Sequence, residues 1–444
     1  MRSAPPGPRL PRPLQSARFL LTEHRLLARY QRRYGDVFAV NTWPFAPLVV
    51  VGDPAEVRRI FTGDPAQLHA GEGNGVLGPL VGPHSVLVLD EAEHLRRRKL
   101  LLPAFHGERM RVYGDVMREL AHAEVDTWPL GSPFPLLGAM QRLTLRIILR
   151  TVFGMREGAR MAELEAALIR LMVDSARVML VPQLQRDLGR WSPQGRFERT
   201  RADVDRMLFA QIAARRERPG DGEDVLSLLV GARDADGIGP SDAELRDHLV
   251  TLLVAGHETT ATTLGWTFER LLRHPAALAR AREEAIAGGH DYLDAVVQES
   301  QRVRPVIGYA MRSLTAPMDV GGYSVKAGAT LGTSINLIHR RPDLYPEPHA
   351  FRPERFAERK PETYSWIPFG GGVRRCLGAA FASFEMRQVL GVVLSRCELA
   401  PADPRPEPRK RKAITYFPAR GAAAILESRA PRPAPAVPEP AVVA

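Results

Sequence analysis

The 444-residue sequence contains only two cysteines, Cys376 and Cys397, and no apolar run near the roughly 18 residues that span a bilayer. Two thiols cannot build a disulfide framework or a four-thiolate metal site, so each cysteine needs its own explanation. The basic N-terminus lacks the apolar stretch that follows in a secretory signal. These absences predict a cytoplasmic protein with no membrane span.

Lysine is also scarce, with five residues among 61 basic side chains that exceed the 50 acidic ones by 11. The excess charge is therefore carried by arginine. Blocks of arginine would indicate nucleic-acid binding, but these arginines are scattered among acids, and no nucleic-acid-binding motif accompanies them. We interpret the charge as a composition bias and expect no nucleic-acid partner.

What the sequence does contain is a composition typical of one large globular chain, 45% hydrophobic and 25% charged. Residues 1–14 are rich in proline and arginine and are predicted to be extended. Residues 429–444 form a proline- and alanine-rich tail that cannot pack a core and is predicted to be disordered. Between them, residues 15–428 show no linker and no repeat, which predicts a single domain.

The hydrophobic pattern predicts a mainly α protein with a small β portion. Ser241 and Glu244 form a capping box that opens one helical pattern up to His274, about 50 Å long, and Pro275 starts the next helix. Short strands are predicted at 36–41, 47–52, 321–325 and 413–417. The other predicted helices are 93–102, 110–128, 138–153, 157–180, 196–216, 292–303 and an apolar, buried one at 377–394.

The sharpest motif is the stretch from Phe369 to Gly378, FGGGVRRCLG, which places Cys376 just before the buried helix. Its three consecutive glycines allow the backbone to pass close to something flat and bulky. A thiol at a helix N-terminus with Arg374 and Arg375 beside it is expected to favour the thiolate. A lone thiolate in such a setting suits an axial ligand of haem iron.

This stretch resembles the haem-binding loop of the cytochrome P450 superfamily, and the resemblance covers about residues 5–426. It implies the fold of that family, with haem b lying between the long central helix and the cysteine loop with its buried helix. Cys376 would then be the iron ligand, and Cys397, which matches no motif, an ordinary core residue. The resemblance assigns further haem contacts to Phe369, Gly370, Gly378, Arg374 and Ala255.

A second motif, AGHETT, lies in the middle of the long helix. His257 and Glu258 could begin the zinc motif H-E-x-x-H, but residue 261 is alanine, so that interpretation fails. Glycine and clustered threonines are poor helix formers, so a plain helix irregularity is the other interpretation. The motif resembles the oxygen-binding groove of the family, where Thr259 would hold dioxygen and a water and Glu258 would link them to bulk protons.

Weaker patterns gain meaning only through the resemblance. His94 and Arg98 share one helix face and, with Arg312, match the family's cations for the two haem propionates. On the same helix, Arg96, Arg97 and Lys99 are expected on a solvated face.

Glu299 and Arg302 at i,i+3 are by themselves an ordinary surface pair. With Arg355 they match a buried network that locks the haem-side fold. A mainly apolar substrate pocket is assigned to the loop 75–88 and to Leu252, Ala255, Val306, Ile307, Tyr309, Ile414, Thr415 and Tyr416. Its two tyrosines, Tyr309 and Tyr416, are expected to offer hydrogen bonds to a substrate.

Together these features predict a monomeric bacterial-type haem-thiolate monooxygenase of secondary metabolism that hydroxylates or epoxidises an apolar small molecule with O2. No fused reductase domain is expected. Electrons would come from a ferredoxin or flavodoxin and its NAD(P)H-dependent reductase, docking on the cysteine side near Arg96, Arg97, Lys99 and Arg375. Two alternatives remain: a haem-thiolate peroxygenase or rearrangement enzyme, and a haem-binding sensor without turnover.

Overall fold

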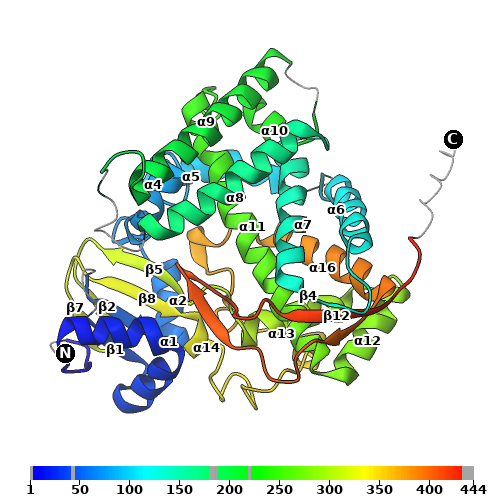
Figure 1. Cartoon of the computed structure of the whole chain (residues 1–444). Coiled ribbons are helices and arrows are strands. Elements are labelled where there is room, and N and C mark those ends of the chain that lie inside the picture. Colours follow the sequence, from blue (N-terminus) through cyan, green and yellow to red (C-terminus); the bar gives the residue numbers. More distant parts are fainter. Residues whose placement is uncertain are drawn as a thin grey trace, which may run out of the picture.

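The computed structural model describes residues 4–432 apart from 42–45, 106, 108, 180–185, 187 and 219–221. Helices dominate these residues and gather around α11 (Asp242–Leu272), which runs through the middle of the molecule (Figure 1). The other helices of eight or more residues are α1 (Arg12–Tyr34), α2 (Pro54–Thr62), α5 (Glu91–Leu101), α6 (Arg109–Asp126), α7 (Leu136–Thr151), α8 (Ala159–Met179), α9 (Pro193–Glu217), α12 (Pro275–Ile286), α13 (Asp291–Val303) and α16 (Ala379–Arg396).

The central helix begins at the predicted capping box. The Ser241 hydroxyl accepts the Glu244 amide at 3.3 Å, and the Glu244 carboxylate accepts the Ser241 amide at 2.7 Å. The helix ends at Leu272, two residues before the predicted His274, and Pro275 opens α12 as expected. Its 31 residues give a length of about 46 Å. In the described part of the chain, no helix is long and apolar enough to cross a membrane.

The β portion consists of small sheets at the edge of the helical body (Figure 1). The largest has the order β1-β2-β8-β5-β3, in which only β2 and β8 are parallel. Its strands are β1 (Val37–Val40), β2 (Leu48–Val51), β3 (Leu68–His69), β5 (Tyr309–Leu314) and β8 (Thr330–Ser334). The others are the sheet β4 (Pro133–Pro135), β12 (Ala423–Arg429), β9 (Cys397–Pro401) and the hairpins β6 (Met318–Val320) with β7 (Tyr323–Val325) and β10 (Arg409–Lys412) with β11 (Thr415–Pro418).

The predicted class, mainly α with a small β portion, is confirmed, and the predicted helices appear with ends shifted by up to three residues. The extended N-terminal segment is wrong from Arg12 onward, because α1 begins there, with Pro11 at its N-cap. The tail boundary also shifts, since Arg429 still pairs with Cys397 in the sheet. Residues 433–444 lie outside the described residues.

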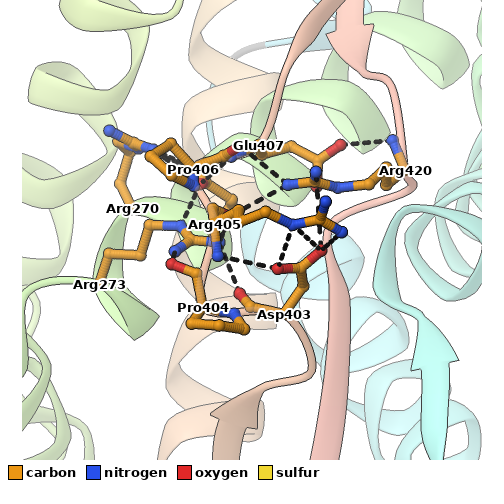
Figure 2. A network of polar contacts seen from close by, with 9 residues as sticks. Arg270, Arg273, Asp403, Pro404, Arg405, Pro406, Glu407 and Arg420 are labelled. Carbon is orange, nitrogen blue, oxygen red and sulfur yellow. Dashed lines mark hydrogen bonds and ion pairs between the residues drawn. The ribbon is translucent and has the colours of Figure 1, made fainter.

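A buried ionic network ties the C-terminal end of α11 to the segment between β9 and β10 (Figure 2). The Glu269 carboxylate, 4% exposed, accepts Arg273 Nε at 2.6 Å and the Glu407 amide at 3.3 Å. Arg273 also donates to the carbonyls of Asp403 and Pro404 at 3.0 and 2.8 Å. The base of the β10–β11 hairpin is therefore fixed against the central helix.

Candidate active site

The loop that carries Cys376 is closed by its own backbone. It joins the short 3-10 helix η4 (Gly372–Arg374) to α16, and the Cys376 amide donates to the Phe369 carbonyl at 2.9 Å. Gly370 has φ +66°, a left-handed conformation that glycine adopts at little cost. The turn places the thiol just before the N-terminal end of α16.

The three glycines of this loop do not all serve the same purpose. A Cβ on Gly371 would lie 2.3 Å from the Phe61 ring, and one on Gly372 would lie 1.8 Å from the Phe61 carbonyl oxygen. These two glycines therefore make room for α2, and the prediction that all three accommodate a flat ligand is wrong for them. Gly370 and Gly378 have nothing within 4 Å of an added Cβ, so their sides stay open to a bound group.

The expected preference of Cys376 for the thiolate is not what the protein alone provides. Burial raises the pKa of the Cys376 thiol, and this outweighs the Gly378 amide and the charges of Arg98 and Arg375, which lower it. The sequence shows the basic residues near Cys376, but it does not show the desolvation of the thiolate that the fold imposes. A coordinated cation supplies the missing stabilisation of a thiolate.

Four basic side chains lie near one another, with few acidic groups to balance their charge: His94, Arg98, Arg312 and Arg374. Burial lowers the pKa of His94 to about 4, with Arg374 and Arg98 adding to the effect. Burial also lowers the pKa of Arg312 and that of Arg374, each to about 10. Arg374 is ion-paired with Asp90. The half-buried Arg98 and the buried Arg312 have no acidic partner among the described residues, so the charge of neither guanidinium is balanced by an ion pair there.

This arrangement fits a haem. Buried arginines are costly unless they meet carboxylates, and haem brings two propionates to the same place. The Cys376 side chain is accessible at its surface, although the protein around it raises the pKa of the thiol by desolvation. Ala255 is also exposed, although it lies in the middle of the central helix. Both side chains are therefore accessible to a bound group.

The Thr259 hydroxyl is positioned by the backbone of α11. It donates to the Ala255 carbonyl at 2.6 Å, and Thr263 repeats the pattern by donating to the Thr259 carbonyl at 2.8 Å. Such bonds to the preceding turn can bend a helix, but α11 is continuous through these residues. Because the hydroxyl proton is directed to Ala255, the Thr259 oxygen presents lone pairs that can accept a hydrogen bond.

Glu258 and His257 point to different surroundings. His257 is buried, with Nδ1 2.9 Å from the Thr144 hydroxyl of α7, and burial lowers its pKa to about 4. Glu258 is 24% exposed and pairs with Lys412, whose Nζ lies 3.3 Å from Oε1. No group of three metal-ligating side chains occurs among the described residues.

Two of the segments assigned to the substrate pocket are joined by backbone contacts. Ile307 and Thr415 form an antiparallel bridge, and the Tyr416 amide donates to the Val306 carbonyl at 2.8 Å. Ile414 lies beside them at the turn of the hairpin and is 46% exposed. On α11, Leu252 is half-buried and Ala255 exposed.

The two tyrosines expected to offer hydrogen bonds to a substrate have rings that pack against other side chains. The Tyr309 ring stacks on Phe19 of α1, with centroids 6.2 Å apart. The buried Tyr416 ring is covered by the Arg409 guanidinium at 3.8 Å. Their rings therefore pack against other side chains of the protein, and a hydrogen bond from either hydroxyl to a substrate stays a prediction.

The loop 75–88 is attached to the central helix. The Ser85 and Thr251 hydroxyls lie 2.6 Å apart, and the His84 amide donates to the Asp247 carboxylate at 2.9 Å. The loop thus meets α11 about one turn before Ala255, on the N-terminal side.

The structure brings Glu299, Arg302 and Arg355 together. Arg302 donates to both Glu299 oxygens at 2.6 and 2.8 Å, and Arg355 Nε reaches Glu299 at 3.2 Å. Glu299 and Arg302 are completely buried, unlike the surface pair that their spacing alone indicates. Arg302 also donates to the carbonyls of His339, Pro348 and Ala350.

The expected basic face of α5 is largely absent. Arg97 is only 5% exposed and pairs with Glu93 and Glu244, and Arg96 donates to Asp234 at 2.8 Å. The sequence could not show these pairs, because Asp234 and Glu244 lie more than 130 residues away. Lys99 remains exposed, as does Arg375 in the cysteine loop.

Sequence reasoning missed two further residues. Asp90, the N-cap residue of α5, binds Arg374, and Lys412 binds Glu258. A β strand rich in basic residues, RKRK at 409–412, was the only sequence signal for the second, and nothing local connects it to α11.

Comparisons with known proteins agree with this geometry. The model of the cytochrome P450 family matches residues 5–421. A protein of Mycobacterium tuberculosis provisionally named cytochrome P450 135B1 is 41% identical over 429 residues, covering 94% of this chain and 90% of its own length. Another from Mycobacterium bovis, provisionally named cytochrome P450 138, is 39% identical and covers 96% of both. The solved structure of retinoic acid-bound cyanobacterial CYP120A1 shares the fold, with a TM-score of 0.83, 24% identity, and coverage of 96% of this chain and 99% of that one.

Proposed function

The chain belongs to the cytochrome P450 family, a family of haem monooxygenases, and from this premise we propose that it inserts one oxygen atom of O2 into an apolar small molecule. The reaction is RH + O2 + 2e⁻ + 2H⁺ → ROH + H2O. The observation that carries the proposal is the pair Glu258–Thr259 in the middle of α11, combined with the thiol of Cys376 and two arginines, the buried Arg312 and the half-buried Arg98, that have no acidic partner in the described part of the chain. Haem b, when bound, supplies the oxygen-activating chemistry, for which a cysteine ligand favours O–O cleavage.

The residues of this chain hold the cofactor and deliver protons. Cys376 would provide the ligand of a bound haem, and its propionates would be met by four basic side chains, those of Arg98, Arg312, Arg374 and His94. The open sides of Gly370 and Gly378, with Phe369 and Ala255, would flank the ring. Thr259 can accept a hydrogen bond from a water or another hydroxyl group beside it, because its own hydroxyl proton is donated to the Ala255 carbonyl. Glu258, partly exposed, exchanges protons with solvent.

Replacing Thr259 by alanine tests the proposal. The Thr259→Ala protein should keep haem and bind ligands as before. Its product-forming rate should fall by about 100-fold, because the hydroxyl that positions the proton delivered to dioxygen is lost. Most of the electrons that NADPH supplies should then appear in hydrogen peroxide. Product and peroxide are measured per NADPH, with Thr263→Ala, one turn further along α11, as the matched control. Equal coupling in both variants would contradict the role of Thr259.

The substrate class rests on the apolar pocket candidates and the packed tyrosine rings. We propose a terpenoid, fatty acid, steroid or polyketide-like molecule, to be screened by the optical shift that ligands cause at the haem. Retinoic acid belongs in that panel as an apolar acid. The intact pair Glu258–Thr259 favours an O2-dependent reaction over a peroxygenase or rearrangement enzyme. The monomeric state, the cytoplasmic location and a role in secondary metabolism stay predictions.

Electrons would arrive from a ferredoxin or flavodoxin and its NAD(P)H-dependent reductase, on the cysteine side. Because Arg96 and Arg97 are engaged in ion pairs, the docking cations are now limited to Lys99 and Arg375. Complementary charge raises mainly the association rate, and salt screens exposed pairs over about 8 Å. Reduction by an acidic ferredoxin should therefore slow as salt rises.

Lys99→Glu should slow this reduction a further two- to five-fold at low salt, as expected for one exposed charge pair. The control is Lys326→Glu, at another exposed lysine directly after β7, which should leave the rate unchanged. Stopped-flow reduction across a salt series measures both. A rate indifferent to salt in all three proteins would contradict docking through charge.

A further inference from the structure

The β10–β11 hairpin lies along α11 and contacts it at three levels. At its base, the Glu407 amide meets Glu269 within the buried network (Figure 2). Midway, the buried Trp266 indole donates to the Tyr416 carbonyl at 3.0 Å. At the tip, Lys412 pairs with Glu258. The hairpin therefore runs beside the helix down to the residue expected to deliver protons.

The three contacts differ in how easily they open. The base and the middle are buried, so separating them would leave unpaired polar groups inside the protein. At the tip, Lys412 is 40% exposed and Glu258 24% exposed. Ion pairs with such access to water are weak, in the range of a 1.5- to five-fold effect on an equilibrium. The tip is thus the one of these contacts that can open and close without disturbing the fold.

The geometry of the tip explains why Lys412 reaches Glu258. Lys412 ends β10 and Thr415 begins β11, with the Thr415 hydroxyl donating to the Lys412 carbonyl at 2.9 Å. Ala413, in the turn between them, has φ +51°, a left-handed conformation that alanine rarely adopts. Among the described residues, Lys412 is the cation paired with Glu258, while the neighbouring His257 faces Thr144.

We propose that Lys412 is a positioning residue for proton delivery: it holds the Glu258 carboxylate at the hairpin tip, in reach of solvent, and must release it before the carboxylate can turn toward Thr259. Removing the ammonium frees Glu258 and speeds proton delivery even without substrate. This inference rests on the proposed function, since it assigns a partner to the same glutamate.

The first test follows wasted electrons in substrate-free holoenzyme with a saturating [2Fe–2S] ferredoxin and its reductase, by NADPH + H⁺ + O2 → NADP⁺ + H2O2. Lys412→Gln should raise the peroxide rate by about 1.5- to five-fold. Lys412→Arg, which keeps a cation, should restore the original rate. Lys410→Gln, an exposed lysine on the same strand, is the matched control and should change nothing.

The second test closes a mutant cycle. In a Glu258→Gln background, Lys412→Gln should have no further effect on the peroxide rate. Amide hydrogen exchange of residues 412–416 supplies a readout that does not depend on turnover. Exchange should rise in Lys412→Gln and in Glu258→Gln, but no further in the double variant, because both remove the same contact.

Three outcomes would overturn the proposal: a Lys412→Gln rate equal to that of Lys410→Gln, a Lys412 effect that persists beside Glu258→Gln, or unchanged exchange at the tip. Failure of the proposed function looks different. In that case the wild type would oxidise no member of the ligand panel, while the exchange cycle would still decide whether Lys412 holds Glu258.

Discussion

Replacing Cys376 by serine should abolish the far-red-shifted Soret band that reduced protein with carbon monoxide shows when a thiolate binds haem iron. The serine hydroxyl is a far weaker ligand, because it does not ionise where burial already raises the pKa of the thiol. Purified wild type should be red and show the band at full strength. The optical difference spectrum measures the loss directly.

Cys397→Ser is the matched control. Cys397 is 3% exposed at the start of β9 and belongs to the main hydrophobic core, so we expect it to have no role at the haem. This variant should keep the band, with at most a loss of stability from a buried hydroxyl. A band lost with Cys397 and kept with Cys376 would overturn the ligand assignment.

Arg302→Ala should destabilise the protein by about 3–5 kcal/mol, the cost of leaving a buried acid without its partner. Glu299 and Arg302 are both completely buried, and three carbonyls lose a donor at the same time. Much of the protein should fail to retain haem. Urea unfolding of the holoprotein, followed by the Soret band and by helical circular dichroism, measures the change.

Arg352→Ala provides the contrast, because its pair with Glu347 is exposed on both sides. Its effect should stay within about 1 kcal/mol. Similar losses for the two arginines would mean that the buried network does not stabilise the fold beyond an ordinary surface pair.

Local signals were sufficient for the long elements. The capping box at Ser241 and the proline at position 275 fix both ends of α11 within two residues, because caps and prolines act over a single turn. The N-terminal helix was missed for the opposite reason. Prolines in residues 1–14 indicated extended chain, yet proline is also favoured in the first turn of a helix, as at the start of α1.

The site could be predicted only where a motif is contiguous. Cys376, Glu258 and Thr259 stand in short strings, and the resemblance carried the haem contacts. The burial of Arg97 and the pair of Lys412 with Glu258 depend on segments more than 100 residues apart. The desolvation of Cys376 depends on how the folded chain surrounds it. The charge of a side chain can be read from the sequence, but its partner and its access to water cannot.

The most direct test of the central claim is the fate of ¹⁸O2 when the holoenzyme, a ferredoxin, its reductase and NADPH turn over the tightest binder of the ligand panel. Mass spectrometry of the product should show one ¹⁸O atom per oxidation, with one NADPH and one O2 consumed, and Cys376→Ser should form none. Product that carries oxygen from water, or that forms with hydrogen peroxide but not with O2 and NADPH, would contradict a monooxygenase.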